Sequence, residues 1–273
     1  MDLKTTTTLN NGVKMPWVGF GVFQTQEGPE VENAVRWALE AGYRHIDTAS
    51  FYENEAGVGK AIAASEVSRD DLFVTTKVWN TEQGYQETLK AFDRSRTKLQ
   101  MDVVDLYLVH WPLKHSFKET YKALEKLYAD GKVRAIGVSN FLPHHLEDLM
   151  SDFDVVPAVD QVEWHPFLFQ KELYEFCKSK GIQQEAWSPL TRGRFLDEPV
   201  LTEIAEAHGK SPAQVLLRWD LQHEVVTIPK SVHKERIIEN SQVFDFELSD
   251  LEMARIDSLD SDTRIGPHPD KMS

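Results

Sequence analysis

The length, composition and charge of the chain exclude several classes of protein. It has 273 residues, of which 41% are hydrophobic, and a formal net charge of −14. A chain of this size can bury a large core, and barrels of this length often form one domain, so we expect a single domain over residues 1–273. The negative charge repels polyanions and no block of Lys or Arg offsets it, so we expect no nucleic-acid partner.

Signals for export or membrane insertion are absent from the sequence. The first residues, MDLKTTTTLNNG, contain no apolar signal core, and no run of about 18 apolar residues occurs. The single cysteine, Cys177, cannot form an internal disulfide. These features predict a cytoplasmic protein with no membrane partner. Cys177 shares a predicted helical face with Leu173 and Phe176, which indicates a buried structural thiol rather than a nucleophile.

The first predicted element is a β-hairpin. Residues 5–18 read TTTTLNNGVKMPWV, in which Asn-Gly lies between two strand-like runs. Asn-Gly is typical of tight hairpin turns because both residues tolerate a positive φ. We expect this hairpin to act as a plug over one end of the sheet that follows.

A helix is predicted over residues 28–42, GPEVENAVRWALEAG. Its apolar residues recur with a helical period: Val31, Ala34, Val35, Ala38 and Leu39. Pro29 suits the first turn and Gly42 suits the end. Later helices are predicted to begin with capping boxes, which pair Ser116 with Glu119, Ser211 with Gln214, and Ser249 with Glu252. Gly131 and Gly181 are predicted to end two of these helices.

Short apolar runs alternate with these helices. Eight of them have the length of buried strands: 17–23, 43–47, 71–79, 103–110, 133–140, 158–164, 182–188 and 225–230. Alternating strands and helices form right-handed units around a parallel sheet. Eight such units in one chain predict an α/β fold, a (β/α)8 TIM barrel with the N-terminal hairpin as its plug.

Polar side chains follow the ends of the predicted strands. They are Asp47, Lys77, His110, Ser139, Asn140, Gln161, Trp187, Ser188, Lys230 and Ser231. In a barrel these strand ends meet at one rim, where the active sites of barrel enzymes lie. The sequence therefore predicts a site at this rim.

Each of these residues also has a structural interpretation. Asp47 could cap a helix, Tyr52 could be a core aromatic, Lys77 could extend its amine to solvent, and His110 could be a core histidine with its hydrogen bonds made. Four such coincidences at one rim are much less probable than a site.

Two glycine motifs and a histidine pair do not support a site. GVGK at 57–60 lacks the full P-loop pattern, and GFG at 19–21 lacks the third glycine of a dinucleotide fingerprint. His144 and His145 are adjacent and are expected to point in different directions, so we expect no shared metal and no metal in the site.

Seven ordered motifs give the chain a family resemblance. HIDTASFYENE, TTKVW, YLVHWP, IGVSNF, QVEWHPF, EAWSPL and IPKSVHKERIIEN resemble those of the aldo-keto reductases over essentially the whole chain. The most similar members are compact microbial ones of the 2,5-diketo-gluconate reductase and glyoxal or methylglyoxal reductase type. The resemblance implies one NADP-dependent oxidoreductase domain, which reduces aldehydes and ketones with NADPH bound across the rim without a Rossmann fold.

The resemblance also implies catalytic roles. Tyr52 would be the general acid, Lys77 and Asp47 its activating pair, and His110 the residue that orients the carbonyl. Hydride addition leaves charge on the carbonyl oxygen, so a proton must be delivered there. An ammonium near 4 Å interacts with a phenolate by roughly 4 kcal/mol at most, so we expect Lys77 to lower the pKa of Tyr52 towards neutrality.

Cofactor and substrate contacts follow from the same resemblance. Trp187 would stack on the nicotinamide, with Ser139, Asn140 and Gln161 bonded to its carboxamide. Ser188 and Leu190 would follow the pyrophosphate. The residues expected to enclose the adenosine end are Lys230, Ser231, Val232, Arg236, Glu239 and Asn240. Lys230 and Arg236 suit a 2′-phosphate and hence NADPH rather than NADH, although both could be solvated surface cations.

Substrate would contact Phe23, Trp79, His110 and Trp111, with Trp164 as a further candidate, although each of these aromatic residues could belong to the core. Two departures bear on specificity. The segment after Trp111 passes almost at once into a helix, and only fourteen residues follow Leu259. A short-looped site favours small or polar carbonyls such as methylglyoxal, short aldehydes and keto sugars.

One position departs from the family pattern, and two other functions stay open. At Thr191 relatives often carry a small residue, which puts the pyrophosphate loop in question. The family suggests a monomer. A cofactor-binding regulatory or structural protein, or a barrel enzyme of unrelated chemistry, remain alternatives to a reductase.

Overall fold

Eight parallel strands form one sheet in the computed structural model, which describes residues 2–272. The sheet order runs without interruption from β10 to β3. The strands are β3 Phe20–Gly21, β4 His45–Asp47, β5 Phe73–Val78, β6 Val104–Val109, β7 Val133–Ser139, β8 Val159–Glu163, β9 Gln183–Trp187 and β10 Val226–Thr227. Each strand lies inside one of the eight predicted runs.

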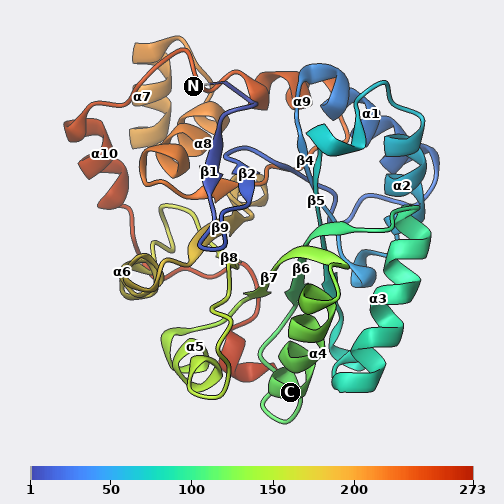
Figure 1. Ribbon diagram of the computed structural model, residues 1–273. Helices are drawn as coiled ribbons and strands as arrows, with labels where there is room; N and C mark the ends of the chain where they lie inside the picture. Colours follow the sequence, from blue (N-terminus) through green and yellow to red (C-terminus); the bar gives the residue numbers. More distant parts are fainter. Residues whose placement is uncertain (1, 273) are drawn as a thin grey trace.

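The sheet closes on itself next to β3 and β10. Val18 forms a parallel bridge with Thr227. The amide of Gly19 donates to the Thr227 carbonyl at 2.9 Å, and the Thr227 amide donates to the Trp17 carbonyl at 3.0 Å. The predicted (β/α)8 barrel is confirmed (Figure 1).

Helices surround the barrel in the order that the sequence predicts (Figure 1). They are α1 Pro29–Ala41, α2 Glu55–Ala63, α3 Tyr85–Leu99, α4 Phe117–Ala129, α5 Pro143–Met150, α6 Lys171–Lys180, α7 Pro199–His208, α8 Pro212–Gln222, α9 Lys234–Ser241 and α10 Asp250–Asp257. Short 3-10 helices cover Ser50–Tyr52, Arg69–Asp71, Asn80–Glu82, Thr191–Gly193 and Pro269–Lys271.

The helix ends agree with most of the predicted signals. The boxes at Ser211 and Ser249 both form, and Gly181 ends α6 in a left-handed conformation. Ser116 precedes α4, but the predicted box with Glu119 is wrong. The Ser116 backbone, with φ −139° and ψ −19°, lacks the extended conformation of a cap, and the Ser116 hydroxyl is directed to Gln83 Oε1, to which it donates at 2.7 Å.

Neighbouring residues of the strands face opposite sides of the sheet, which separates the helix layer from the barrel interior. Thr76 of β5 donates to Glu55 of α2 at 2.6 Å, outside the barrel. The next residue, Lys77, bonds to Asp47 of β4 inside the barrel. Every residue of β5 is buried. The interior therefore holds polar side chains where the strands end.

The N-terminal hairpin closes the barrel at the opposite end from those side chains. Strands β1 Thr6–Thr8 and β2 Lys14–Pro16 pair antiparallel. Leu9 and Met15 are buried in a core cluster that includes Phe73 at the start of β5. This confirms the predicted plug, because Leu9 and Met15 supply apolar surface where the interior has no helix to cover it.

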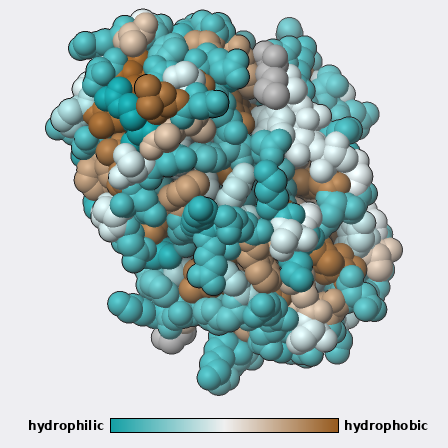
Figure 2. Space-filling view, turned by 90° about the vertical axis from the view of Figure 1, so that its left-hand side faces the viewer, coloured by the Kyte–Doolittle hydropathy of each residue, from teal (hydrophilic) through white to brown (hydrophobic). Residues whose placement is uncertain are grey.

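One face of the outer surface is mainly polar. On the face shown in Figure 2, hydrophilic residues predominate and hydrophobic ones are scattered. Within residues 2–272, none of the helices has the length and apolar composition needed to cross a membrane.

Candidate active site

A cleft of about 950 Å3 opens at the carboxyl ends of the barrel strands. Every predicted site residue lines it except Lys77, which is fully buried in the floor, and the further candidate Trp164. The predicted residues in its lining are Phe23, Asp47, Tyr52, Trp79, His110, Trp111, Ser139, Asn140, Gln161, Trp187, Ser188, Leu190, Lys230, Ser231, Val232, Arg236, Glu239 and Asn240.

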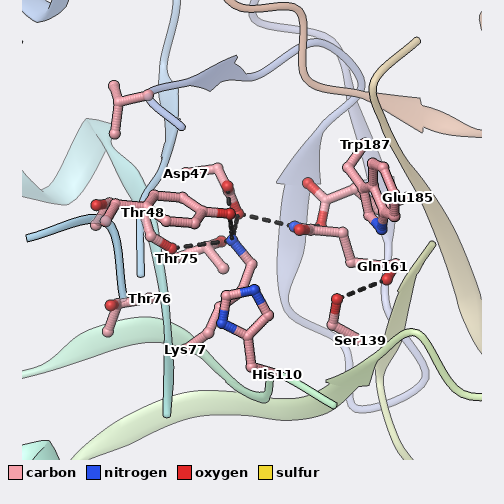
Figure 3. A network of polar contacts seen from close by, with 12 residues as sticks. Asp47, Thr48, Thr75, Thr76, Lys77, His110, Ser139, Gln161, Glu185 and Trp187 are labelled. Carbon is pink, nitrogen blue, oxygen red and sulfur yellow. Dashed lines mark hydrogen bonds and ion pairs between the residues drawn. The ribbon is translucent and has the colours of Figure 1, made fainter. Parts of the chain in front are cut away.

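Lys77 joins Asp47 to Tyr52 in the floor of the cleft. Figure 3 shows Lys77 next to Asp47. Its Nζ lies 2.7 and 2.9 Å from the two Asp47 oxygens, 3.0 Å from the Thr48 carbonyl and 3.3 Å from Tyr52 Oη. An ammonium has three protons, so all of them are engaged. Tyr52 Oη accepts one of these bonds and keeps its own proton free to donate.

The pKa of Tyr52 does not agree with the sequence-based expectation. Burial raises the pKa of Tyr52 above its usual value, and the opposing effect of the Lys77 ammonium is smaller; the Asp47 carboxylate adds to the rise. The expected lowering towards neutrality is therefore wrong for the protein without ligand. The reason is desolvation, which penalises a buried phenolate and cannot be read from residue spacing. Tyr52 holds its proton throughout the neutral range.

The Asp47 and Lys77 pair lies out of water, with the side chains 2% and 0% exposed. Burial raises the pKa of Asp47, and contacts with Lys77 and Gln161 oppose that rise. Burial disfavours the Lys77 ammonium, yet Asp47 and Tyr52 together raise the pKa of Lys77. The pair keeps Lys77 charged next to the phenol.

His110 sits at the end of β6 and faces the same cleft. Burial, and then the Lys77 charge, lower the pKa of His110 well below its usual value. The ring is therefore neutral and offers one N–H donor. Its Nδ1 has no hydrogen-bond partner within residues 2–272, so the ring is free to place its proton on Nε2 and donate into the cleft.

A chain of hydrogen bonds links the strand ends opposite the tyrosine. Trp187 Nε1 donates to Asn140 Oδ1 at 2.8 Å, and Asn140 Nδ2 donates to the His110 carbonyl at 3.0 Å. The Ser139 hydroxyl donates to the Gln161 carbonyl at 2.7 Å. Asn140 has a left-handed φ of 65°, which asparagine tolerates better than most residues. These bonds hold the indole of Trp187 against the cleft.

Gln161 connects this chain to Asp47 and Lys77. Its Nε2 donates to Asp47 Oδ2 at 2.8 Å and to Glu185 Oε2 at 2.8 Å. Both protons of the side-chain amide are then used, and the side-chain oxygen Oε1 makes no hydrogen bond within residues 2–272. That free acceptor, beside the indole of Trp187, fits the amide group of a nicotinamide.

The loop after β9 forms the wall beside Trp187. Ser188, Thr191 and Arg192 all have a φ of 53°. Thr191 is fully buried, and its hydroxyl donates to the Leu190 carbonyl at 2.7 Å. A branched residue in this conformation is strained, so the departure at Thr191 is accommodated by a local hydrogen bond. The Arg192 guanidinium lies 5.7 Å from the Phe23 ring.

The far end of the cleft carries positive charge on an acidic protein. Lys230 and Arg236 both line it, Lys230 after β10 and Arg236 on α9. Lys230 donates to the Gln24 carbonyl at 3.2 Å, and burial lowers the pKa of Lys230. Two cations beside a groove lined by Glu239 and Asn240 suit a phosphate attached to a ribose.

An aromatic wall stands beside His110. The Trp79 ring centroid lies 5.0 Å from that of His110, and Phe51 stacks on Trp79 at 3.8 Å. Trp111 lies on the other side at 6.5 Å. The prediction for Trp164 is wrong, because it is fully buried and packs on other aromatic side chains of the core.

The structure adds residues that the sequence analysis missed. Phe51, Gln24, Pro267 and Met272 line the cleft, and Glu185 lies beneath it. Phe51 is 44% exposed, and an aromatic residue next to Tyr52 was a usable signal. Pro267 and Met272 belong to the C-terminal tail, whose sequence gave no signal of a site.

The short tail reaches the cleft because Glu163 holds it. The Ile265 and Gly266 amides donate to the Glu163 carboxylate at 2.5 and 3.0 Å. A side chain on Gly266 would meet the Trp187 ring at 2.4 Å. The tail therefore packs directly on Trp187, and the expectation of a site left open by a short tail needs this correction.

His144 and His145 do not point apart as expected. Their ring centroids lie 4.0 Å apart, and both Nε2 atoms approach Asp270 Oδ1, at 3.0 and 3.2 Å. His145 Nδ1 accepts the Leu142 amide at 3.1 Å, so its Nε2 carries the proton that faces Asp270. Both histidines lie in the first turn of α5, and Asp270 of the C-terminal tail contacts both rings.

The fold and the cleft define a (β/α)8 barrel with a Tyr, Lys, Asp and His group at the carboxyl ends of its strands. The Aldo/keto reductase family model matches residues 18–261. The chain belongs to the aldo/keto reductase family. Members of this family reduce carbonyl compounds with NADPH, and the present chain is an oxidoreductase of that type.

Individual relatives support this assignment. The chain is 59% identical to a glyoxal reductase of Bacillus subtilis (strain 168), covering 99% of this chain and 98% of that protein. It is 43% identical to a methylglyoxal reductase of Salmonella typhimurium, covering 96% of each. A Bombyx mori aldo-keto reductase solved with NADP superposes with a TM-score of 0.91 at 36% identity, covering 97% of this chain and 96% of that chain.

Proposed function

We propose that this protein reduces small, polar aldehydes and ketones, and that Asp47, Tyr52, Lys77 and His110 carry out the catalysis. The observation that carries the proposal is the contact of 3.3 Å between Lys77 Nζ and Tyr52 Oη on the floor of a cleft with a free amide acceptor. The names of the glyoxal and methylglyoxal reductases among the relatives support the substrate class.

The roles of the residues follow from the protons they can move. NADPH supplies the hydride when bound. Neutral His110 donates a hydrogen bond to the carbonyl oxygen and so fixes the carbon that receives the hydride. Tyr52 passes its proton to the same oxygen as negative charge develops there. Lys77 stabilises the phenolate that remains, and Asp47 holds Lys77 in place.

Burial of Tyr52 suits its role as proton donor in the reduction. A phenol with a raised pKa is fully protonated before the reaction, so its proton is available to the carbonyl oxygen. The charge that appears on Tyr52 during transfer lies 3.3 Å from an ammonium in a site screened from water. Lys77 therefore acts mainly on the transition state rather than on the resting phenol.

The residues of the cleft suit NADPH in particular. Gln161, Asn140 and Ser139 would hold the nicotinamide amide, and Trp187 would stack on its ring. Ser188 and Leu190 would follow the pyrophosphate. The two cations, Lys230 and Arg236, would bind the 2′-phosphate that distinguishes NADPH from NADH. Ser231, Val232, Glu239 and Asn240 complete the adenosine end.

The surroundings of His110 favour a small substrate. Trp79, Trp111 and Phe23 crowd the carbonyl position, and Met272 and Pro267 of the tail narrow the opening. Two polar donors, His110 and Tyr52, and several aromatic faces suit short aldehydes, dicarbonyls and keto sugars. We also expect one protein molecule to act alone, because the cleft is complete within one chain; light scattering during gel filtration tests this. We expect the protein in the cytoplasm, because a single cysteine suits a reducing compartment; cell fractionation tests this.

Loss of NADPH absorbance with methylglyoxal tests the function. We expect turnover with NADPH, slower turnover with NADH, and a loss of at least about a hundredfold in Tyr52→Phe. Tyr128→Phe, a tyrosine on α4 outside the cleft, is the matched control and should keep full activity. A Tyr52→Phe variant that binds NADPH and keeps full turnover would exclude Tyr52 as the acid.

A further inference from the structure

Glu185 is a second carboxyl group inside the barrel, next to the catalytic group but not part of the cleft lining. It precedes Trp187 by two residues on β9 and therefore faces the same side of the sheet. It is fully buried. Gln161 Nε2 donates to its Oε2 at 2.8 Å, and its Oε1 has no hydrogen-bond partner within residues 2–272. Figure 3 shows Gln161 reaching between Asp47 and Glu185.

The charges around Glu185 do not balance an ionised carboxylate. Asp47 of β4 is already paired with Lys77 of β5, and Tyr52 is neutral. His45 Nε2 lies 3.6 Å from Glu185 Oε1, but burial and then Lys77 lower the pKa of His45 to about 3. His45 is therefore neutral. Burial, together with the charge on Asp47, raises the pKa of Glu185 to about 8.

Asp47 and Glu185 together hold the Gln161 amide. Two carboxyl groups, Asp47 and Glu185, accept the two Nε2 protons. If the amide turned over, its oxygen would face the Asp47 carboxylate, and the bond to Asp47 would be replaced by repulsion between two acceptors. The pair therefore leaves the Gln161 oxygen, an acceptor, for the amide protons of nicotinamide.

We propose that Glu185 is a positioning residue that holds the Gln161 amide and, by losing its proton, shifts the site from NADPH and carbonyl reduction towards NADP+ and alcohol oxidation. The inference rests on the proposed function. When Glu185 is neutral, the charges of Asp47 and Lys77 balance each other inside the barrel. Ionised Glu185 adds a negative charge, which opposes formation of the Tyr52 phenolate and favours the cationic ring of NADP+ over the neutral ring of NADPH.

Binding of the two cofactor forms tests the charge directly. We would measure the dissociation constants of NADPH and NADP+ by protein fluorescence at about pH 6.5 and about pH 9.5, either side of the expected transition. We would compare the ratio of the NADP+ affinity to the NADPH affinity at each pH. Both cofactors carry the same 2′-phosphate, so its contribution cancels in this ratio. In the wild type we expect affinity for NADP+ relative to NADPH to rise roughly tenfold over this range.

Glu185→Gln keeps the shape and the bond to Gln161 but cannot ionise. In this variant the ratio should stay constant, and the decline of the reduction rate at alkaline pH should move to higher pH. Asp160→Asn is the matched control, because Asp160 is a buried carboxyl whose pKa burial raises, but it faces the helix side of β8. The same pH dependence in the wild type and in Glu185→Gln would overturn the proposal.

Positioning is tested by Glu185→Ala, which frees one proton of the Gln161 amide. We expect NADPH binding to weaken about fivefold to tenfold at neutral pH, where Glu185→Gln binds like the wild type. Equal NADPH binding by Glu185→Ala and Glu185→Gln would exclude the positioning role. If Glu185→Ala does not fold, the pH dependence of the NADP+ to NADPH affinity ratio in Glu185→Gln tests the proposal. Both binding measurements apply even if no carbonyl substrate is turned over, so failure of the proposed function stays distinguishable.

Discussion

Lys77 Nζ lies 3.3 Å from the hydroxyl oxygen of Tyr52, close enough for the ammonium to donate a hydrogen bond to the phenol. The same nitrogen lies 2.7 Å from Asp47 Oδ1. One buried cation thus contacts both a carboxylate and a phenol. We therefore expect Lys77 to affect both the stability of the fold and the rate of the reaction, and we expect substitution to separate the two effects.

Replacing Lys77 by methionine is expected to lower both quantities. The Tyr52 phenolate loses its counter-charge, so the rate should fall by at least about a hundredfold. Asp47 is left buried without its partner, which costs about 3 to 5 kcal/mol. The double variant Lys77→Met with Asp47→Asn should recover most of the stability in urea unfolding but none of the rate. Recovery of the rate would show that Lys77 serves only the fold.

Removing the Arg236 guanidinium is expected to weaken NADPH binding and leave NADH binding unchanged. A charge-assisted contact with the 2′-phosphate exists only for NADPH, so Arg236→Ala should reduce its preference by about tenfold. Titration calorimetry with both cofactors measures this. Arg255→Ala, on α10 and outside the cleft, controls for loss of a positive charge. If Arg236→Ala weakened the binding of NADPH and NADH equally, Arg236 would not contact the 2′-phosphate.

A methyl group on Gly266 is expected to disturb the cofactor site from the tail. An added Cβ would meet the Trp187 ring at 2.4 Å, so either the tail or the indole must move. We expect Gly266→Ala to weaken NADPH binding several-fold and to change Trp187 fluorescence, with global stability nearly unchanged. Ser261→Ala, on the same tail but outside the cleft lining, is the control. Unchanged binding in Gly266→Ala would show that the tail does not hold Trp187.

Folding stability is expected to depend on pH through Glu185. Its pKa rises from 4.5 to about 8 on folding. The folded state thus binds the proton more tightly, and its contribution to stability is complete below pH 4.5 and is lost as pH rises to about 8. Glu185→Gln should become more stable than the wild type across this window, by up to several kcal/mol, in urea unfolding at a series of pH values. Glu66→Gln, on the exposed surface, should show no such divergence.

Much of the fold was predictable because its signals are local. The spacing of Val31, Ala34 and Val35 predicted α1, and the apolar run at 103–110 predicted β6. Where local signals compete with distant partners, prediction failed. Ser116 has the sequence of a helix cap, but its backbone is not extended and its hydroxyl is directed to Gln83. Trp164 follows a strand like the residues that line the cleft, yet its ring turns into the core.

The sequence by itself determined the barrel, its plug and which polar residues stand at the strand ends, because side-chain periodicity and chain order are properties of neighbouring residues. Only the tertiary structure decided how those groups titrate and pair. Gln161 and Asp47 are 114 residues apart and meet at 2.8 Å. The raised pKa values of Tyr52 and Glu185 come from burial among such distant partners. Desolvation depends on everything that surrounds a group, which is why it appears only when the chain is folded.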